Sequence, residues 1–202
     1  MLDDLSLQQM LFRLLAVVVV SGVHGFALAG TARLLGDPGP AQDGRLTLDP
    51  FVHLAVLGVI GGIAARMAWI RPIDIEAPLL RGKRLGLVVC VLASLAVLPL
   101  LAAGALALRP LAASIEDALL ARYALLALTV LAECAVWFAI FNLLPLPPLT
   151  GGHLLAAVAP GLAAAIARRS GVVSLLLAVV LVLGGGVWFR SVLGPLEGIL
   201  LR

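Results

Sequence analysis

Long apolar runs alternate with short polar links along the 202-residue chain. Most of these runs reach the roughly 20 residues that a helix, rising about 1.5 Å per residue, needs to cross a hydrocarbon core of about 30 Å. We therefore predict an all-α polytopic membrane protein with about five transmembrane helices, one broken by prolines. The predicted spans cover residues 11–35, 51–70, 85–108, 119–143 and 172–189.

The predicted span 51–70 is the least typical of the five. It has His53 near its start, Arg66 near its end and three glycines between them. Small residues at this density allow neighbouring helices to approach closely, which favours an interior position. The pattern leaves open whether this segment crosses the membrane or is re-entrant.

The polar links on either side of this segment predict short interfacial strands. Apolar and polar residues alternate in Arg45-Leu46-Thr47-Leu48, and a second extended piece is expected over residues 71–75. The stretch 66–84 contains five basic residues, whereas 36–50 contains one. If 51–70 crosses the membrane, the positive-inside rule places 66–84 in the cytoplasm and 36–50 on the opposite side.

The amino-acid composition excludes most other classes of protein. Hydrophobic residues make up 62% of the chain, charged residues 12%, and mean hydropathy is +1.16, so no water-soluble domain of any size is left. We predict one integral membrane domain over residues 1–202, with the lipid bilayer as its first partner. The net charge of +3 comes without a continuous basic patch, which argues against nucleic-acid binding. Cys90 and Cys134 lie in apolar spans without metal-binding spacing.

Residues 141–153, which we call the proline string, interrupt the fourth apolar run. Three prolines within four residues remove backbone donors, so an ordinary helix cannot continue. Broken backbone at membrane depth is tolerated where it is packed in protein or lines a cavity, which makes this segment a candidate site. We expect Asn142 to bond the freed backbone groups. The structural or binding residues predicted here are Asn142, Pro145, Pro147, Pro148, Gly151 and Gly152.

Glu133 is a further candidate, because a carboxylate inside a membrane span is costly and is often functional. The structural alternatives are an ion pair with Arg66 or a histidine, or a protonated acid bonded to a carbonyl. Structural pairs are commoner than proton relays in a small bundle, so the structural interpretation is favoured.

The proline string closely resembles the signature of the site-2 protease family, the intramembrane zinc metalloproteases, in which this segment reads roughly NLLPIPPLDGG. Thr150 stands where the family has an aspartate that binds zinc. The resemblance extends to the link, where Gly44-Arg45-Leu46-Thr47-Leu48 and His53 follow the family pattern. The matching residues of the string are Asn142, Pro145, Pro147, Pro148, Leu149, Gly151 and Gly152.

The same resemblance aligns the family's HExxH motif with residues 24–28, which read His24-Gly25-Phe26-Ala27-Leu28. The first histidine is present, but Gly25 replaces the general base and Leu28 the second ligand. With Thr150 at the third ligand position, one imidazole cannot supply the three protein ligands of a catalytic zinc. The resemblance therefore implies a degenerate ancestral site at His24, Gly25, Leu28 and Thr150.

We interpret the chain as a catalytically inactive, site-2-protease-like protein of the bacterial inner membrane, with no cofactor. It would hold a transmembrane segment of a partner, or act as an accessory subunit of a larger membrane complex. The alternative is an active zinc protease using His24 with His53 or His153 and a base such as Glu133. On the first interpretation Asn142 matters for stability, whereas little depends on the Thr150 hydroxyl.

Overall fold

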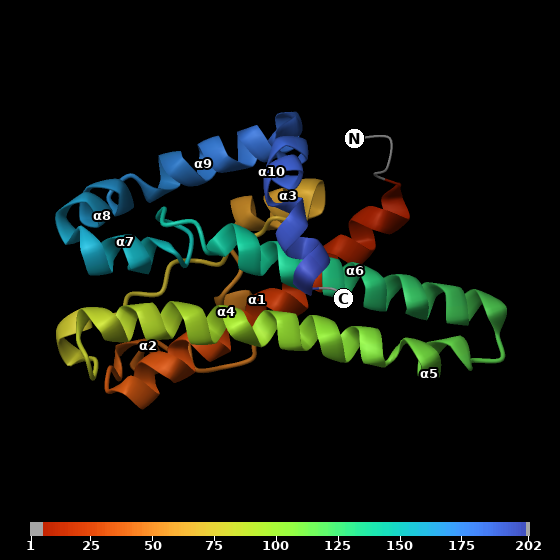
Figure 1. Cartoon of the computed structure of the whole chain (residues 1–202), viewed down its shortest axis with the longest axis horizontal. Helices are drawn as coiled ribbons and strands as arrows, with labels where there is room; N and C mark the ends of the chain where they lie inside the picture. Colours follow the sequence, from red (N-terminus) through yellow and green to blue (C-terminus); the bar gives the residue numbers. More distant parts are fainter. Residues whose placement is uncertain (1–5, 201–202) are drawn as a thin grey trace.

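Three long helices form the centre of the protein, shown by a computed structural model that describes residues 6–200. They are α1 (Leu7–Leu35), α4 (Arg84–Ala107) and α6 (Ala118–Asn142), and they run alongside one another (Figure 1). All three are long and apolar enough to cross a membrane. The first, third and fourth predicted spans are thereby confirmed as helices, while residues 1–5 and 201–202 of the predicted domain lie outside the described part.

Local signals set the ends of these helices. The Ser6 hydroxyl accepts a hydrogen bond from the Gln9 backbone at the start of α1, and Gly36, at φ 114°, donates to the last carbonyls of that helix. Asp117 caps α6 by accepting from the Leu120 backbone. These are ordinary start and stop residues, and they stand at the ends of the apolar runs. The extent of each run therefore predicts the extent of its helix well.

The predicted span 51–70 does not form a membrane-crossing helix. Its helix, α3 (Val56–Ala65), has ten residues and is about 15 Å long, half of what a crossing needs. Arg66 adopts a left-handed conformation (φ 65°) and the chain turns back. The return is tightly packed, since a Cβ on Gly58 would lie 2.1 Å from the Trp69 carbonyl oxygen.

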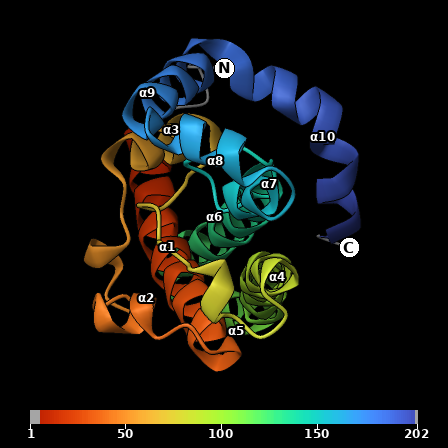
Figure 2. The same cartoon turned by 90° about the vertical axis from the view of Figure 1, so that its left-hand side faces the viewer.

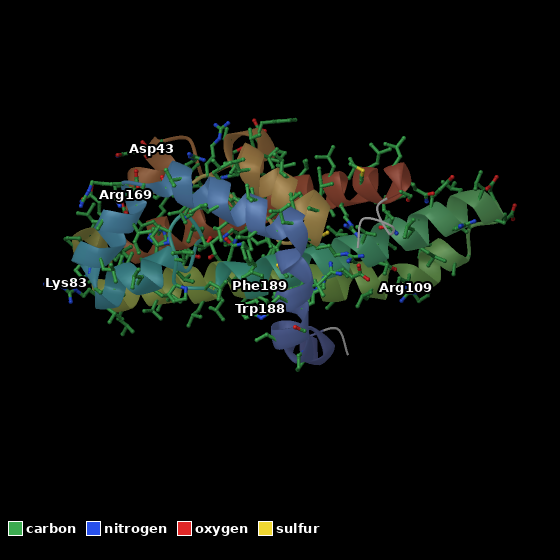
Figure 3. The ribbon with its side chains drawn as sticks, turned by 90° about the horizontal axis from the view of Figure 1, so that it is seen from above. Asp43, Lys83, Arg109, Arg169, Trp188 and Phe189 are labelled. Carbon is green, nitrogen blue, oxygen red and sulfur yellow. The ribbon has the colours of Figure 1, made fainter. Side chains whose placement is uncertain are left out.

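Residues 36–83 therefore form a hairpin between α1 and α4. The Arg81 N–H donates to the Leu35 carbonyl at 2.7 Å, so the hairpin leaves and returns at the same end of the bundle. Links 36–50 and 66–84 are not separated by a crossing, which corrects the orientation drawn from five spans. Lys83 and Asp43 lie toward one end of the molecule and Arg109 toward the other (Figure 3).

The predicted interfacial strands are absent from the described residues. The hairpin contains α2 (Gly39–Gln42) and two short 3₁₀ turns, η1 (Pro50–Val52) and η2 (Ala77–Leu79), and its β-pairing is a single bridge between Leu54 and Ile70. Side chains take the place of a strand partner around residues 45–48. The Arg45 guanidinium donates to the Val52 carbonyl, and the Thr47 carbonyl bonds the His53 ring.

The C-terminal part covers one side of the central helices. After α6 the chain forms α7 (Gly152–Val158), α8 (Pro160–Ala167), α9 (Ser170–Val180), a π-helical turn (Leu181–Gly185) and α10 (Gly186–Leu200), while α5 (Arg109–Ala113) extends α4. The predicted straight span 172–189 is instead interrupted at Gly184 (φ 112°). Pro160–Ala167 and Ser170–Gly184 meet at 75° and make at most a fourth, broken span. In Figure 2, α10 arcs from the end of α9 to the C-terminus, and Phe189 on α10 contacts Phe141 of α6 with ring centroids 5.6 Å apart.

Candidate functional site

Asn142, the last residue of α6, ties the proline string to the hairpin. Its side chain is fully buried, and its Nδ2 donates to the carbonyls of Ala68 at 2.8 Å and Phe138 at 2.9 Å. Its Oδ1 accepts from the Thr150 N–H at 3.3 Å, and its own carbonyl accepts from the Gly151 N–H at 2.7 Å. One side chain thus bonds broken backbone from two segments that are far apart in the sequence.

The rest of the proline string folds back closely on itself. Pro147 and Pro148 are buried, whereas Pro145 is exposed. A Cβ on Gly151 would lie 2.2 Å from the Leu144 carbonyl oxygen, and one on Gly152 would lie 2.9 Å from the Pro147 nitrogen. The two glycines are therefore required by close backbone packing as α7 begins.

His24 is fully buried on α1 and bonded through both ring nitrogens. Its Nε2 lies 2.7 Å from the Thr150 Oγ1, and its Nδ1 lies 3.3 Å from the Ser94 carbonyl oxygen. Since a carbonyl can only accept, Nδ1 carries the proton, and the Thr150 hydroxyl donates to Nε2. The Thr150 hydroxyl thus bonds a buried ring, a contact that the expectation drawn from the sequence for this hydroxyl did not include.

Leu28 lies one helical turn after His24 on the same face of α1. It is 1% exposed and lines the same cleft as Thr150. Positions 24, 28 and 150 thus converge from two segments that are more than a hundred residues apart. Of the three side chains, only the imidazole is an ordinary zinc ligand.

The space beside Gly25 is filled by the ring of His53. A Cβ on Gly25 would lie 2.2 Å from the His53 Nδ1, with the next two ring atoms within 2.5 Å. His53 is fully buried, and its Nε2 lies 3.0 Å from the Thr47 carbonyl oxygen. Burial lowers the pKa of His53, against the opposing effect of the Thr47 bond. A neutral imidazole thus occupies the position into which a side chain at residue 25 would project.

Glu133 lies well away from this site. It is nine residues before Asn142 on α6, about 14 Å along the helix. Its Oε2 lies 2.8 Å from the Arg66 Nε, which is the structural pairing considered from the sequence. The pair joins α6 to the end of α3, where the Arg13 guanidinium also donates to the Ile63 carbonyl at 2.8 Å.

A cleft of about 420 Å³ opens next to Thr150. One wall is formed by part of the return segment, residues 67–76, and the other by the proline string, α7 and α8. His153 lines it, and burial lowers the pKa of this histidine although Asp74 and the Ile73 backbone act in the other direction. This cleft is not among the sites predicted from the sequence. The sequence signal for one of its walls is the alternation of Ile73 and Ile75 with Asp74 and Glu76.

Comparison with known proteins identifies one relative. A Bacillus subtilis (strain 168) protein named "Putative zinc metalloprotease YwhC" is 30% identical over 161 residues, which cover 76% of the chain and 72% of that relative. The chain belongs to this zinc metalloprotease family. No family model and no solved structure matches the chain.

The residues of this chain do not fit the zinc ion that the relative's name implies. Among the described residues, no three His, Cys, Asp or Glu side chains are grouped so as to hold a metal ion. At the three convergent positions, Leu28 and Thr150 lack a strong ligand atom, and His24 already uses both nitrogens. A site with three protein ligands cannot be assembled there without substitution.

Proposed function

We propose that the protein is a non-catalytic member of its family, a pseudoprotease of the bacterial inner membrane that binds a segment of another membrane protein. The observation that carries this proposal is the 2.7 Å hydrogen bond between His24 and Thr150. His24 is the one zinc ligand of the family pattern that this chain retains. Its Nε2 accepts a hydrogen bond from the Thr150 hydroxyl, at the position where the family has a carboxylate.

The lack of a general base supports the same proposal. Catalytic zinc hydrolysis requires a base beside the bound water. Gly25 has no side chain and the His53 ring fills the adjacent space, so position 25 supplies no carboxylate. Glu133, the base considered for an active enzyme, is paired with Arg66.

The cleft supplies a place for binding. Its volume of about 420 Å³ lies within the range of roughly 300–1,000 Å³ typical of ligand sites. Its lining is mainly isoleucine, proline and alanine, which suits an apolar segment in extended form. The protein would hold such a segment as an accessory or scaffold subunit of a larger membrane complex.

The alternative, an active zinc protease with unusual ligands, has weaker support. It relies on His24 with His53 or His153. The His53 Nε2 faces the Thr47 carbonyl, and its Nδ1 is packed against Gly25. The His53 Nδ1 has no hydrogen-bond partner, but among the described residues no three ligand side chains are grouped around a common point where a metal could bind.

Metal content separates these two functions. Purified parent protein, dialysed against micromolar zinc, is expected to retain none in stoichiometric amount. Leu28→His with Thr150→Asp is expected to retain about one zinc per chain, because three ligands would then converge with His24. Each single substitution is the control and is expected to retain little. Stoichiometric zinc in the parent that is lost in His24→Gln would overturn the proposal in favour of the protease.

Binding in the cleft is tested by filling it. Ala164 is exposed and lines the cleft, whereas Ala165, next along α8, does not line it. We expect Ala164→Trp to reduce the binding of an apolar peptide to protein in lipid nanodiscs at least about tenfold, as when several side chains lose their burial. Ala165→Trp is the matched control and should bind like the parent. Equal binding by both variants would exclude the cleft.

A further inference from the structure

The charged residues that line the cleft are all acidic. Asp74 and Glu76 lie on the return segment, and every other lining residue is uncharged apart from His153. Burial lowers the pKa of His153, which keeps it neutral near pH 7. A cleft that is otherwise apolar thus has two negative charges at one wall.

Both carboxylates are exposed and available to a ligand. Ile73 is buried and Ile75 partly buried, whereas Asp74 and Glu76 are exposed, as expected for an extended segment with alternate side chains on opposite faces. Neither carboxylate forms an ion pair with another described residue. Arg45 lies near enough to Asp74 to sense its charge, but its guanidinium donates to the Val52 carbonyl and does not line the cleft.

The position of the cleft indicates which part of a partner would reach it. The return segment reaches the end of the bundle where α4 begins, since the Glu76 N–H donates to Asp37, just beyond α1, at 2.7 Å. That end bears Arg33, Arg81, Lys83 and Arg84, and the positive-inside rule places it in the cytoplasm. By the same rule, the cytoplasmic flank of a transmembrane segment is rich in Lys and Arg.

We propose that the cleft selects an apolar polypeptide segment followed by a basic flank, with Asp74 and Glu76 binding the Lys or Arg side chains. This inference rests on the proposed function and adds the chemical class of the partner. The apolar residues of the segment lie against the isoleucine and proline walls, and the basic side chains lie at the exposed rim. An acidic flank would be repelled by the two carboxylates. The cleft would therefore prefer segments with a basic flank, and it would also fix which end of the segment lies at the rim.

Three fluorescent peptides provide the test. They share one apolar core of about eight residues, long enough to follow an extended wall, and end in two Lys, two Gln or two Glu. Binding is measured by anisotropy to the full chain in nanodiscs of zwitterionic lipid, so that anionic lipid does not attract the basic peptide. We expect the Lys peptide to bind about fivefold more tightly than the Gln peptide and the Glu peptide to bind most weakly, a scale suited to exposed ion pairs.

In the double variant Asp74→Asn with Glu76→Gln, the three peptides should bind with similar affinity, and the affinity of the Gln peptide should be the same as in the parent. Asp43→Asn is the matched control, because Asp43 is exposed and lies outside the cleft. It should preserve the Lys preference. Raising the salt concentration should reduce the preference in the parent but not the binding of the Gln peptide.

The possible outcomes separate the two proposals. If all three peptides bind equally, or the Lys preference survives in the double variant, the charge selection is wrong and the binding function stands. If no peptide binds, or binding to empty nanodiscs is as strong, both the binding function and the selection are wrong. Only a Lys preference that the double variant loses supports the inference.

Discussion

Replacing Asn142 with leucine tests how the broken backbone is held in place. Leucine is close to asparagine in size but cannot form hydrogen bonds. The substitution removes the Nδ2 bonds to the Ala68 and Phe138 carbonyls and the Oδ1 bond from the Thr150 N–H. The Phe138 carbonyl keeps its place in the helix, so the main losses fall on the Ala68 carbonyl and the Thr150 N–H.

The expected loss of stability follows from these two groups. Each buried polar group left without a partner costs about 1–3 kcal/mol. Asn142 is fully buried, so water cannot readily replace the lost bonds. The sum is about 2–6 kcal/mol, and burial of the leucine offsets part of it. For a chain of this length, about 2–4 °C of melting temperature is lost for each kcal/mol.

Thermal unfolding in mild detergent, followed by tryptophan fluorescence, measures the effect. Trp69 and Trp137 are both 1% exposed, so their emission reports on the packing of the hairpin against α6. Leu143→Ala is the neighbouring control, since Leu143 is 45% exposed and its side chain makes no hydrogen bond. We expect that variant to stay within about 0.5 kcal/mol of the parent. An Asn142→Leu protein that melts with the parent would refute the assigned role.

Four further predictions follow from the site and the hairpin. Gly25→Ala should lower the melting temperature through its collision with the His53 ring, and adding His53→Ala should restore part of the loss, as a double-mutant cycle would show. Thr150→Val should destabilise by about 1–3 kcal/mol in denaturant unfolding, because the His24 Nε2 loses its donor; an unchanged midpoint would contradict this. Glu133→Gln should be destabilising in the parent but much less so beside Arg66→Met, and equal effects in both backgrounds would exclude coupling. Because burial lowers the pKa of His53 below 6.5, the unfolded chain binds more protons, so stability should fall as pH drops below about 6.5, with a slope that His53→Gln reduces.

The sequence is informative about the long helices because their determinants are local. A run of apolar residues with a serine or aspartate before it is enough to predict α1 and α6. The hairpin is different, since residues 51–70 are as apolar as a true span. What stops α3 is the left-handed Arg66 and the packing of Gly58 against Trp69, and both depend on tertiary structure.

The candidate site divides in the same way. The resemblance to a known family was enough to identify positions 24, 28 and 150, and the structure brings them together. The placement of the His53 ring over Gly25 could not be read from sequence spacing, because the two residues belong to different segments. The cleft was missed for a similar reason: its walls come from the return segment and α8, which no local motif links.

The bond between Asn142 and the Ala68 carbonyl also sets an order for biosynthesis. The donor follows the acceptor by 74 residues, so this bond can form only after α4 and the whole of α6 have been made and have left the ribosome. Among the described residues, Asn142 is the side chain that bonds the Ala68 carbonyl. We therefore expect the return segment to become fixed late in biosynthesis, and a chain shortened before Asn142 should leave residues 67–76 open to protease.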